Sequence, residues 1–112
     1  MKNYFLFRTD SSVVNDEIDV STDYFGGDIT QIQENDVCIC YQPNTLLILG
    51  IFVYTSSQTL QLIQKNTTHC TIRDCYDCFS FIQEITQNTS RMFKKKSRKI
   101  LENDFLQVQK KL

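Results

Sequence analysis

The segment 37–55 constrains the fold of this chain more than any other part. Its first five residues, VCICY, are apolar or aromatic throughout, and larger side chains alternate with cysteines. A turn around Pro43 follows, and residues 46–55 form a second run that is rich in β-branched and aromatic side chains. Two such runs joined by a short polar turn are typical of a β-hairpin. We therefore expect this hairpin to form the centre of a sheet.

Other apolar runs predict the remaining elements. The run YFLF at 4–7 predicts an opening strand, residues 60–64 and 69–73 predict two more strands, and residues 13–28 read as a polar loop. Near the C-terminus, apolar residues recur at helical spacing, at Leu101, Phe105, Val108 and Leu112. The pattern predicts an α+β fold, in which a small mixed sheet of five or six strands curls into a partial β-barrel and a C-terminal helix follows it.

The length of the chain indicates the number of domains. A chain of 112 residues matches one domain of ordinary size, so we expect residues 1–112 to form a single domain. The apolar run 46–53 is far shorter than the ~20 residues that cross a bilayer. Residues 1–8 contain too short an apolar region for a secretory signal. We therefore expect a soluble, cytoplasmic protein with no membrane partner and with its five cysteines reduced.

Charge is distributed unevenly along the chain. Residues 1–36 contain eight acidic side chains and two basic ones, although the formal net charge of the whole chain is only −1. Residues 91–99 contain six basic side chains and no acidic one. This basic stretch suits phosphate groups, and Phe93 within it offers a ring for packing or stacking. A solvated loop before the last helix is the alternative interpretation. The phosphate-binding candidates are Lys94, Lys95, Lys96, Arg98 and Lys99.

A second group of reactive side chains lies at 69–78. His69, Cys70, Cys75 and Cys78 include a C-x2-C pair with the spacing of a zinc turn. On a strand, however, the adjacent His69 and Cys70 point to opposite sides, and no second separated pair completes a site. We therefore expect these cysteines to be small core residues, and we expect no metal or cofactor.

The sequence contains no known catalytic pattern. A P-loop, a nucleophile elbow, a zinc-protease helix motif and a dinucleotide-binding glycine motif are all missing. The single histidine, His69, has a cysteine only as its sequence neighbour, and neighbours on a strand do not converge as a catalytic pair must. The prediction is a protein that is not an enzyme.

The order of several short motifs resembles that of EVE and PUA-like domains. An aromatic opening strand, an aromatic pair before glycine, a strand beginning with Asn-Asp, a Gly-Ile strand and a Leu-x-x-x-Phe helix start occur in the order of that superfamily. The segments that carry the resemblance are YFLFR at 4–8, YFG at 24–26, NDVCICY at 35–41, GIFV at 50–53 and LENDF at 101–105. The chain lacks the tryptophan that is usual in such domains, and Asn35 replaces a glycine.

The resemblance implies a pseudo-barrel with an aromatic cleft that holds a base flipped out of DNA or RNA, often a modified base. Carried onto this chain, the base-binding candidates are Tyr41, Tyr24, Phe25 and Phe52, with Tyr41 as the leading one. The alternative interpretation is that Phe52 is a core residue of a long buried strand and that Tyr24 and Phe25 anchor a loop. The expected function is a non-catalytic nucleic-acid-binding module. The rival hypothesis is a small protein-interaction or inhibitor module of phage or host-defence type, whose acidic N-terminal face contacts a basic partner protein.

Overall fold

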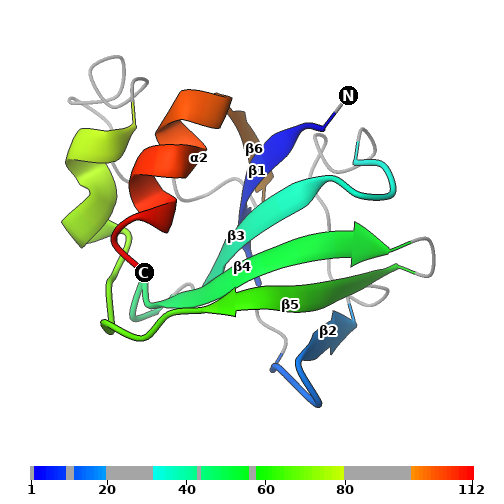
Figure 1. Ribbon diagram of the computed structural model, residues 1–112. Helices are drawn as coiled ribbons and strands as arrows, with labels where there is room; N and C mark the ends of the chain where they lie inside the picture. Colours follow the sequence, from blue (N-terminus) through cyan, green and yellow to red (C-terminus); the bar gives the residue numbers. More distant parts are fainter. Residues whose placement is uncertain (1, 10–11, 20–31, 43, 56–57, 80–96) are drawn as a thin grey trace.

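The computed structural model describes residues 2–9, 12–19, 32–42, 44–55, 58–79 and 97–112. Within these ranges the chain forms one mixed sheet, a short 3-10 helix and an α-helix (Figure 1). The strands are β1 (Tyr4–Arg8), β2 (Glu17–Asp19), β3 (Val37–Tyr41), β4 (Ile48–Thr55), β5 (Thr59–Lys65) and β6 (Ser97–Ile100). The helices are η2 (Arg73–Cys78) and α2 (Glu102–Gln109).

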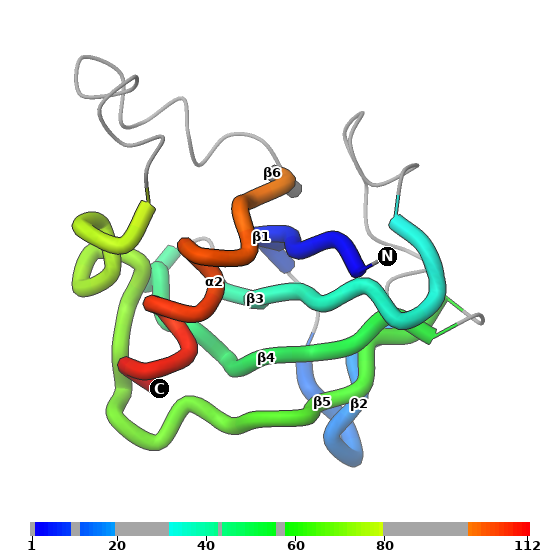
Figure 2. Tube along the Cα trace, turned by 45° about the horizontal axis from the view of Figure 1, so that its top comes forward, coloured from blue at the N-terminus to red at the C-terminus, as the bar shows by residue number. Residues whose placement is uncertain are grey.

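The strand order in the sheet is β2-β5-β4-β3-β1-β6. β3 and β4 form the expected antiparallel hairpin, in which Ile39 pairs with Ile51. β1 pairs with β3 in parallel, with Leu6 opposite Ile39, and every other neighbouring pair is antiparallel. The predicted α+β class and mixed sheet are confirmed. The sheet is curved but not closed, so β2 and β6 are its edges among the described residues (Figure 2).

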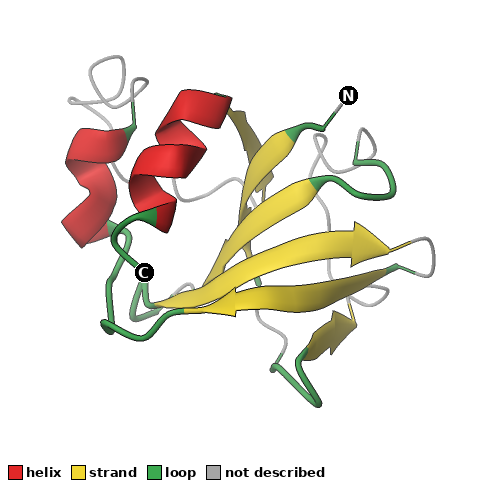
Figure 3. Cartoon of the chain, viewed as in Figure 1, coloured by secondary structure: helices red, strands yellow, loops and turns green. Residues whose placement is uncertain are grey.

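The sheet buries apolar side chains on both of its faces. Successive side chains of a strand point to opposite faces, which explains why β3 is apolar along its whole length. One face carries Leu6 and Ile39 and is covered by η2 and α2, which lie on the same side of the sheet (Figure 3). The opposite face carries Phe5, Phe7, Ile18, Cys38, Cys40, Phe52 and Leu60. The core is therefore divided into two apolar layers by the sheet.

Gly50 lies at a place where β4 and β5 leave no room for a side chain. Its φ of 153° belongs to a region that side-chain-bearing residues rarely adopt. A Cβ atom at this position would lie 2.4 Å from the carbonyl oxygen of Gln64 and 2.8 Å from a methyl carbon of Leu62. The register of the two strands shifts just after this point, between Ile51 and Phe52. The absence of a side chain at Gly50 thus allows β4 to lie against β5 just before this shift in register.

The C-terminal helix forms as predicted, whereas the strand expected at 69–73 does not. Phe105, Val108 and Leu112 are buried against the sheet, but Leu101 precedes the helix and is exposed. In the segment 69–73, Thr71 makes only an isolated bridge to Leu47, and the chain then turns into η2. The structure also adds two short strands, β2 and β6, in segments that read as loops in the sequence.

Within the described residues, no helix combines the length and the apolar character that a bilayer crossing requires.

The two-sided burial predicts different responses to the same substitution. Ile39 and Ile51 are each 0% exposed, whereas Ile63 on β5 is 57% exposed. We expect Ile39→Asp and Ile51→Asp to abolish folding, because an unpaired buried carboxylate costs several kcal/mol in a domain stabilised by only ~5 to ~15 kcal/mol. The matched control, Ile63→Asp, should change the free energy of unfolding by less than ~0.5 kcal/mol. Thermal melts followed by circular dichroism test this, and cooperative unfolding of either core variant contradicts it.

Candidate nucleic-acid interface

The described part of the basic stretch forms an edge strand. Arg98 and Lys99 lie on β6, where Lys99 pairs with Phe5 of β1, and the Lys99 side chain is exposed. Ile100, the next residue, points to the opposite face and is buried. Lys94, Lys95 and Lys96 lie outside the described residues. The structure therefore places two of the five phosphate-binding candidates on one outer strand of the sheet.

This edge strand is anchored through its neighbour β1 to the C-terminal helix. Ile100 pairs with Tyr4, whose ring lies 4.6 Å from the ring of Phe105 on α2, centroid to centroid. The hydroxyl of Tyr4 donates a hydrogen bond of 3.3 Å to a carboxylate oxygen of Glu102. Burial of Ile100 and its pairing with β1 attach β6 to the part of the sheet that packs on α2. The exposed Lys99 is thus carried by a strand that is packed on one side.

The opposite edge of the sheet is acidic. β2 carries Glu17 and Asp19, both exposed, on either side of the fully buried Ile18. Four strands, β5, β4, β3 and β1, separate β2 from β6 in the strand order. The uneven charge of the sequence therefore becomes a separation of charge across the sheet, with acidic groups on one edge and basic residues on the other.

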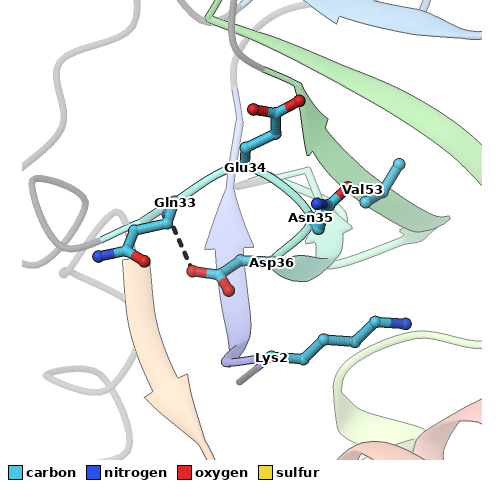
Figure 4. Close-up of a pocket in the computed structure, with 6 residues that line it drawn as sticks. All are labelled: Lys2, Gln33, Glu34, Asn35, Asp36 and Val53. Atoms are coloured by element: carbon cyan, nitrogen blue, oxygen red, sulfur yellow. Dashed lines mark hydrogen bonds between the residues drawn. The ribbon is translucent and has the colours of Figure 1, made fainter.

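A polar pocket of about 420 Å³ opens at the end of the sheet where β3 begins. The described residues that line it are Lys2, Gln33, Glu34, Asn35, Asp36 and Val53, and they include no aromatic side chain (Figure 4). The pocket thus lacks the ring that a stacked base requires.

Asp36 in this pocket is a structural carboxylate. It is buried, and one of its oxygens accepts a hydrogen bond of 3.0 Å from the backbone N–H of Asn3. The other oxygen accepts one of 2.9 Å from the backbone N–H of Gln33, as Figure 4 shows. Both oxygens therefore connect the start of β3 to neighbouring segments, and the burial of this side chain leaves little of it accessible to a ligand.

The structure does not bring the predicted base-binding rings together. Tyr41 is 1% exposed and packs on the face that η2 and α2 cover, whereas Phe52 is 0% exposed and packs on the opposite face. Neither ring presents a surface to a base, and the two rings are not brought together in one cleft. The physical reason is that β3 and β4 are central strands with both faces buried. Tyr24 and Phe25 lie outside the described residues.

The residues considered for zinc are only partly brought together. Cys70 and Cys75 are buried with their sulfur atoms 3.2 Å apart, and Cys78 is buried near them. His69 has a φ of 56° and its side chain is exposed. In the described part of the chain, no three histidine, cysteine or acidic residues are arranged as a metal site. All five cysteines are free thiols.

No family model, curated protein or solved structure matches the chain significantly. The resemblance to EVE and PUA-like domains accordingly stays a prediction.

The environment of Tyr41 predicts a late step in an alkaline titration. Burial, partly opposed by the nearby charge of Arg8, raises the pKa of Tyr41 from 10.0 to about 12. Because the folded state holds this proton more tightly than the unfolded chain, the contribution of Tyr41 to stability is complete below pH 10.0 and is lost as the pH rises toward 12. Tyrosinate absorbance of the folded protein should show an ionisation near pH 12 that Tyr41→Phe removes, whereas the pKa of Tyr4, which is raised by burial and by the charge of Glu102, should keep its own shift in that variant. Ionisation of all five tyrosines near pH 10 would place Tyr41 at the surface.

Proposed function

We propose that the protein is a non-catalytic module that binds the phosphate backbone of a nucleic acid through the basic edge of its sheet. The observation that carries the proposal is the separation of charge between β6 and β2. Half of the 12 lysines and arginines lie in residues 91–99, and the described end of this stretch is the edge strand β6. Among the described residues no strand pairs with the outer side of β6, which leaves that side to approach an extended polyanion.

Electrostatics gives this arrangement an orientation as well as an affinity. Phosphates attract Lys99 and the other basic side chains of the stretch, and binding releases the counterions condensed on the nucleic acid. Glu17 and Asp19 on β2 repel the same phosphates. The protein would therefore approach a nucleic acid with β6 forward, although its net charge of −1 gives no attraction over longer distances.

Contact with a base is the finer part of the proposal. Since Tyr41 and Phe52 are buried, a ring that stacks on a base comes from Tyr24 or Phe25, the two remaining candidates from the resemblance to EVE and PUA-like domains. Stacking on such a ring would add ~1 to ~3 kcal/mol per base. This contribution is independent of salt, which separates it from the phosphate contacts in an experiment.

Removing basic side chains from the edge strand should weaken binding only through the salt-dependent part of the affinity. We expect Lys99→Ala to lower the affinity for single-stranded and duplex DNA and RNA, and to reduce the slope of log affinity against log salt by ~0.7 to ~0.9. The triple change of Lys94, Lys95 and Lys96 to alanine should produce a larger loss of the same kind. Fluorescence anisotropy at several salt concentrations, starting at ~50 mM, measures both quantities.

Lys65→Ala is the matched control for this series. Lys65 is also exposed but lies on β5, which three strands separate from β6. Its removal should leave the salt slope unchanged. Absence of binding at low salt, or binding that survives the triple substitution, overturns the proposal and favours the protein-interaction module, in which the exposed Glu17 and Asp19 of β2 would contact a basic partner.

A further inference from the structure

Two thiols of the helix-covered face are in direct contact. The sulfur atoms of Cys70 and Cys75 lie 3.2 Å apart, and both residues are buried, with exposed fractions of 7% and 0%. Cys78 is buried in the same apolar layer, whereas Cys38 and Cys40 lie on the other face of the sheet. The contact joins the segment after β5 to η2, away from the basic residues of β6.

The position of Cys70 is determined by the side chain of Asn66. The amide nitrogen of Asn66 donates hydrogen bonds of 2.8 Å to the carbonyl oxygens of both Ile48 and Cys70. Its amide oxygen accepts one of 3.3 Å from the backbone N–H of Cys70. One side chain thus connects both polar groups of the Cys70 backbone to the start of β4. This bracing leaves Cys70 little freedom to move away from its neighbour.

Cys75 is held from the other side by the first turn of η2. Its backbone N–H donates a hydrogen bond of 3.0 Å to the carbonyl oxygen of Ile72. Asp74 accepts hydrogen bonds of 2.9 Å and 3.1 Å from the backbone N–H and the hydroxyl of Thr71. The ammonium group of Lys111 donates to the carbonyl oxygen of Asp74 at 2.9 Å. Both sulfur atoms are therefore carried by backbone that hydrogen bonds fix in place.

We propose that Cys70 and Cys75 are a redox-active pair that hydrogen peroxide converts into an intramolecular disulfide. The sulfur atoms have to approach by only about 1 Å to reach the ~2.05 Å of a disulfide bond. The two side chains reach this distance by small rotations, since the backbone already holds them in contact. The bond would link the chain just before η2 to the first half of that helix.

The reaction proceeds in two balanced steps. The Cys70 sulfur, after losing its proton to water, attacks one peroxide oxygen; the O–O bond breaks, hydroxide leaves and takes up a proton, and Cys70 becomes a sulfenic acid. The Cys75 sulfur then attacks the Cys70 sulfur, the S–O bond breaks, and the departing hydroxide takes the Cys75 proton. In total, two thiols lose two electrons and two protons, and one peroxide becomes two water molecules.

The environments of the two sulfurs assign the order of these steps. Cys70 is the more accessible thiol of the two, so peroxide reaches it first. Burial and the hydrogen bond with Cys70 raise the pKa of the Cys75 thiol, which disfavours its ionisation and therefore an initial attack from this residue. Cys75 is accordingly the resolving thiol, in contact with the oxidised sulfur as soon as it forms.

Peptide mapping of the folded protein after peroxide treatment tests the proposal. Thiols that remain free are alkylated after denaturation, and trypsin then separates peptide 66–73, which contains Cys70, from peptide 74–91, which contains Cys75 and Cys78. We expect these two peptides to be joined, with the loss of two hydrogen atoms, and the number of alkylated thiols to fall from five to three. Dithiothreitol should restore all of them.

Two single substitutions identify the bridged residues. Cys78→Ser should leave the joined peptides unchanged, because the partner of Cys70 is then necessarily Cys75. Cys75→Ser should remove the bridge and leave a sulfenic acid on Cys70 that dimedone traps. Five alkylated thiols after treatment of the wild type, or a bridge that persists in Cys75→Ser, overturns the proposal. If a serine variant fails to fold, fragmentation of the joined wild-type peptides decides the question, because it shows whether Cys78 carries the alkyl group and Cys75 the bridge, or the reverse.

Discussion

The burial of β3 on both faces is the constraint on which the rest of the structure depends. Its neighbours β1 and β4 pair with it on either side, so the strand has no edge and no solvent-exposed face. Every side chain from Val37 to Tyr41 therefore needs an apolar partner, from the helices on one face or from residues such as Phe5 and Phe52 on the other. The two layers of the core exist because this strand requires both.

Sequence patterns predicted the elements whose own residues determine their structure. The hairpin at 37–55 and the helix after Leu101 have apolar side chains at strand and helix periods, and both were confirmed. β2 and β6 were missed because they are short edge strands that depend on pairing with β5 and β1. The prediction of a strand at 69–73 was wrong. The carboxylate of Asp74 accepts hydrogen bonds from the backbone N–H and the hydroxyl of Thr71, and these bonds favour a turn that leads into the 3-10 helix η2.

The candidate site was predictable in its charge but not in its shape. The basic stretch at 91–99 is visible in the sequence, whereas its position on the edge opposite Glu17 and Asp19 follows only from the strand order. The burial of Tyr41 could not be predicted from its own segment, because the helices that cover its ring come from residues more than thirty positions away. The contact between Cys70 and Cys75 likewise depends on η2, which the apolar pattern did not predict.

The place of β1 in the sheet has a consequence for how the chain reaches its native state. β1 pairs in parallel with β3 and antiparallel with β6, so its two partners lie far along the chain, and the pairing of Tyr4 with Ile100 spans almost its whole length. Contacts of such large sequence separation slow folding, because the entropy of closing a long loop opposes them until they are complete. The antiparallel strands β3, β4 and β5 are close in sequence and can pair early. β1 completes its pairing only when β6, near the other end of the chain, is in place. During that interval the aromatic residues of β1 are a hazard for aggregation.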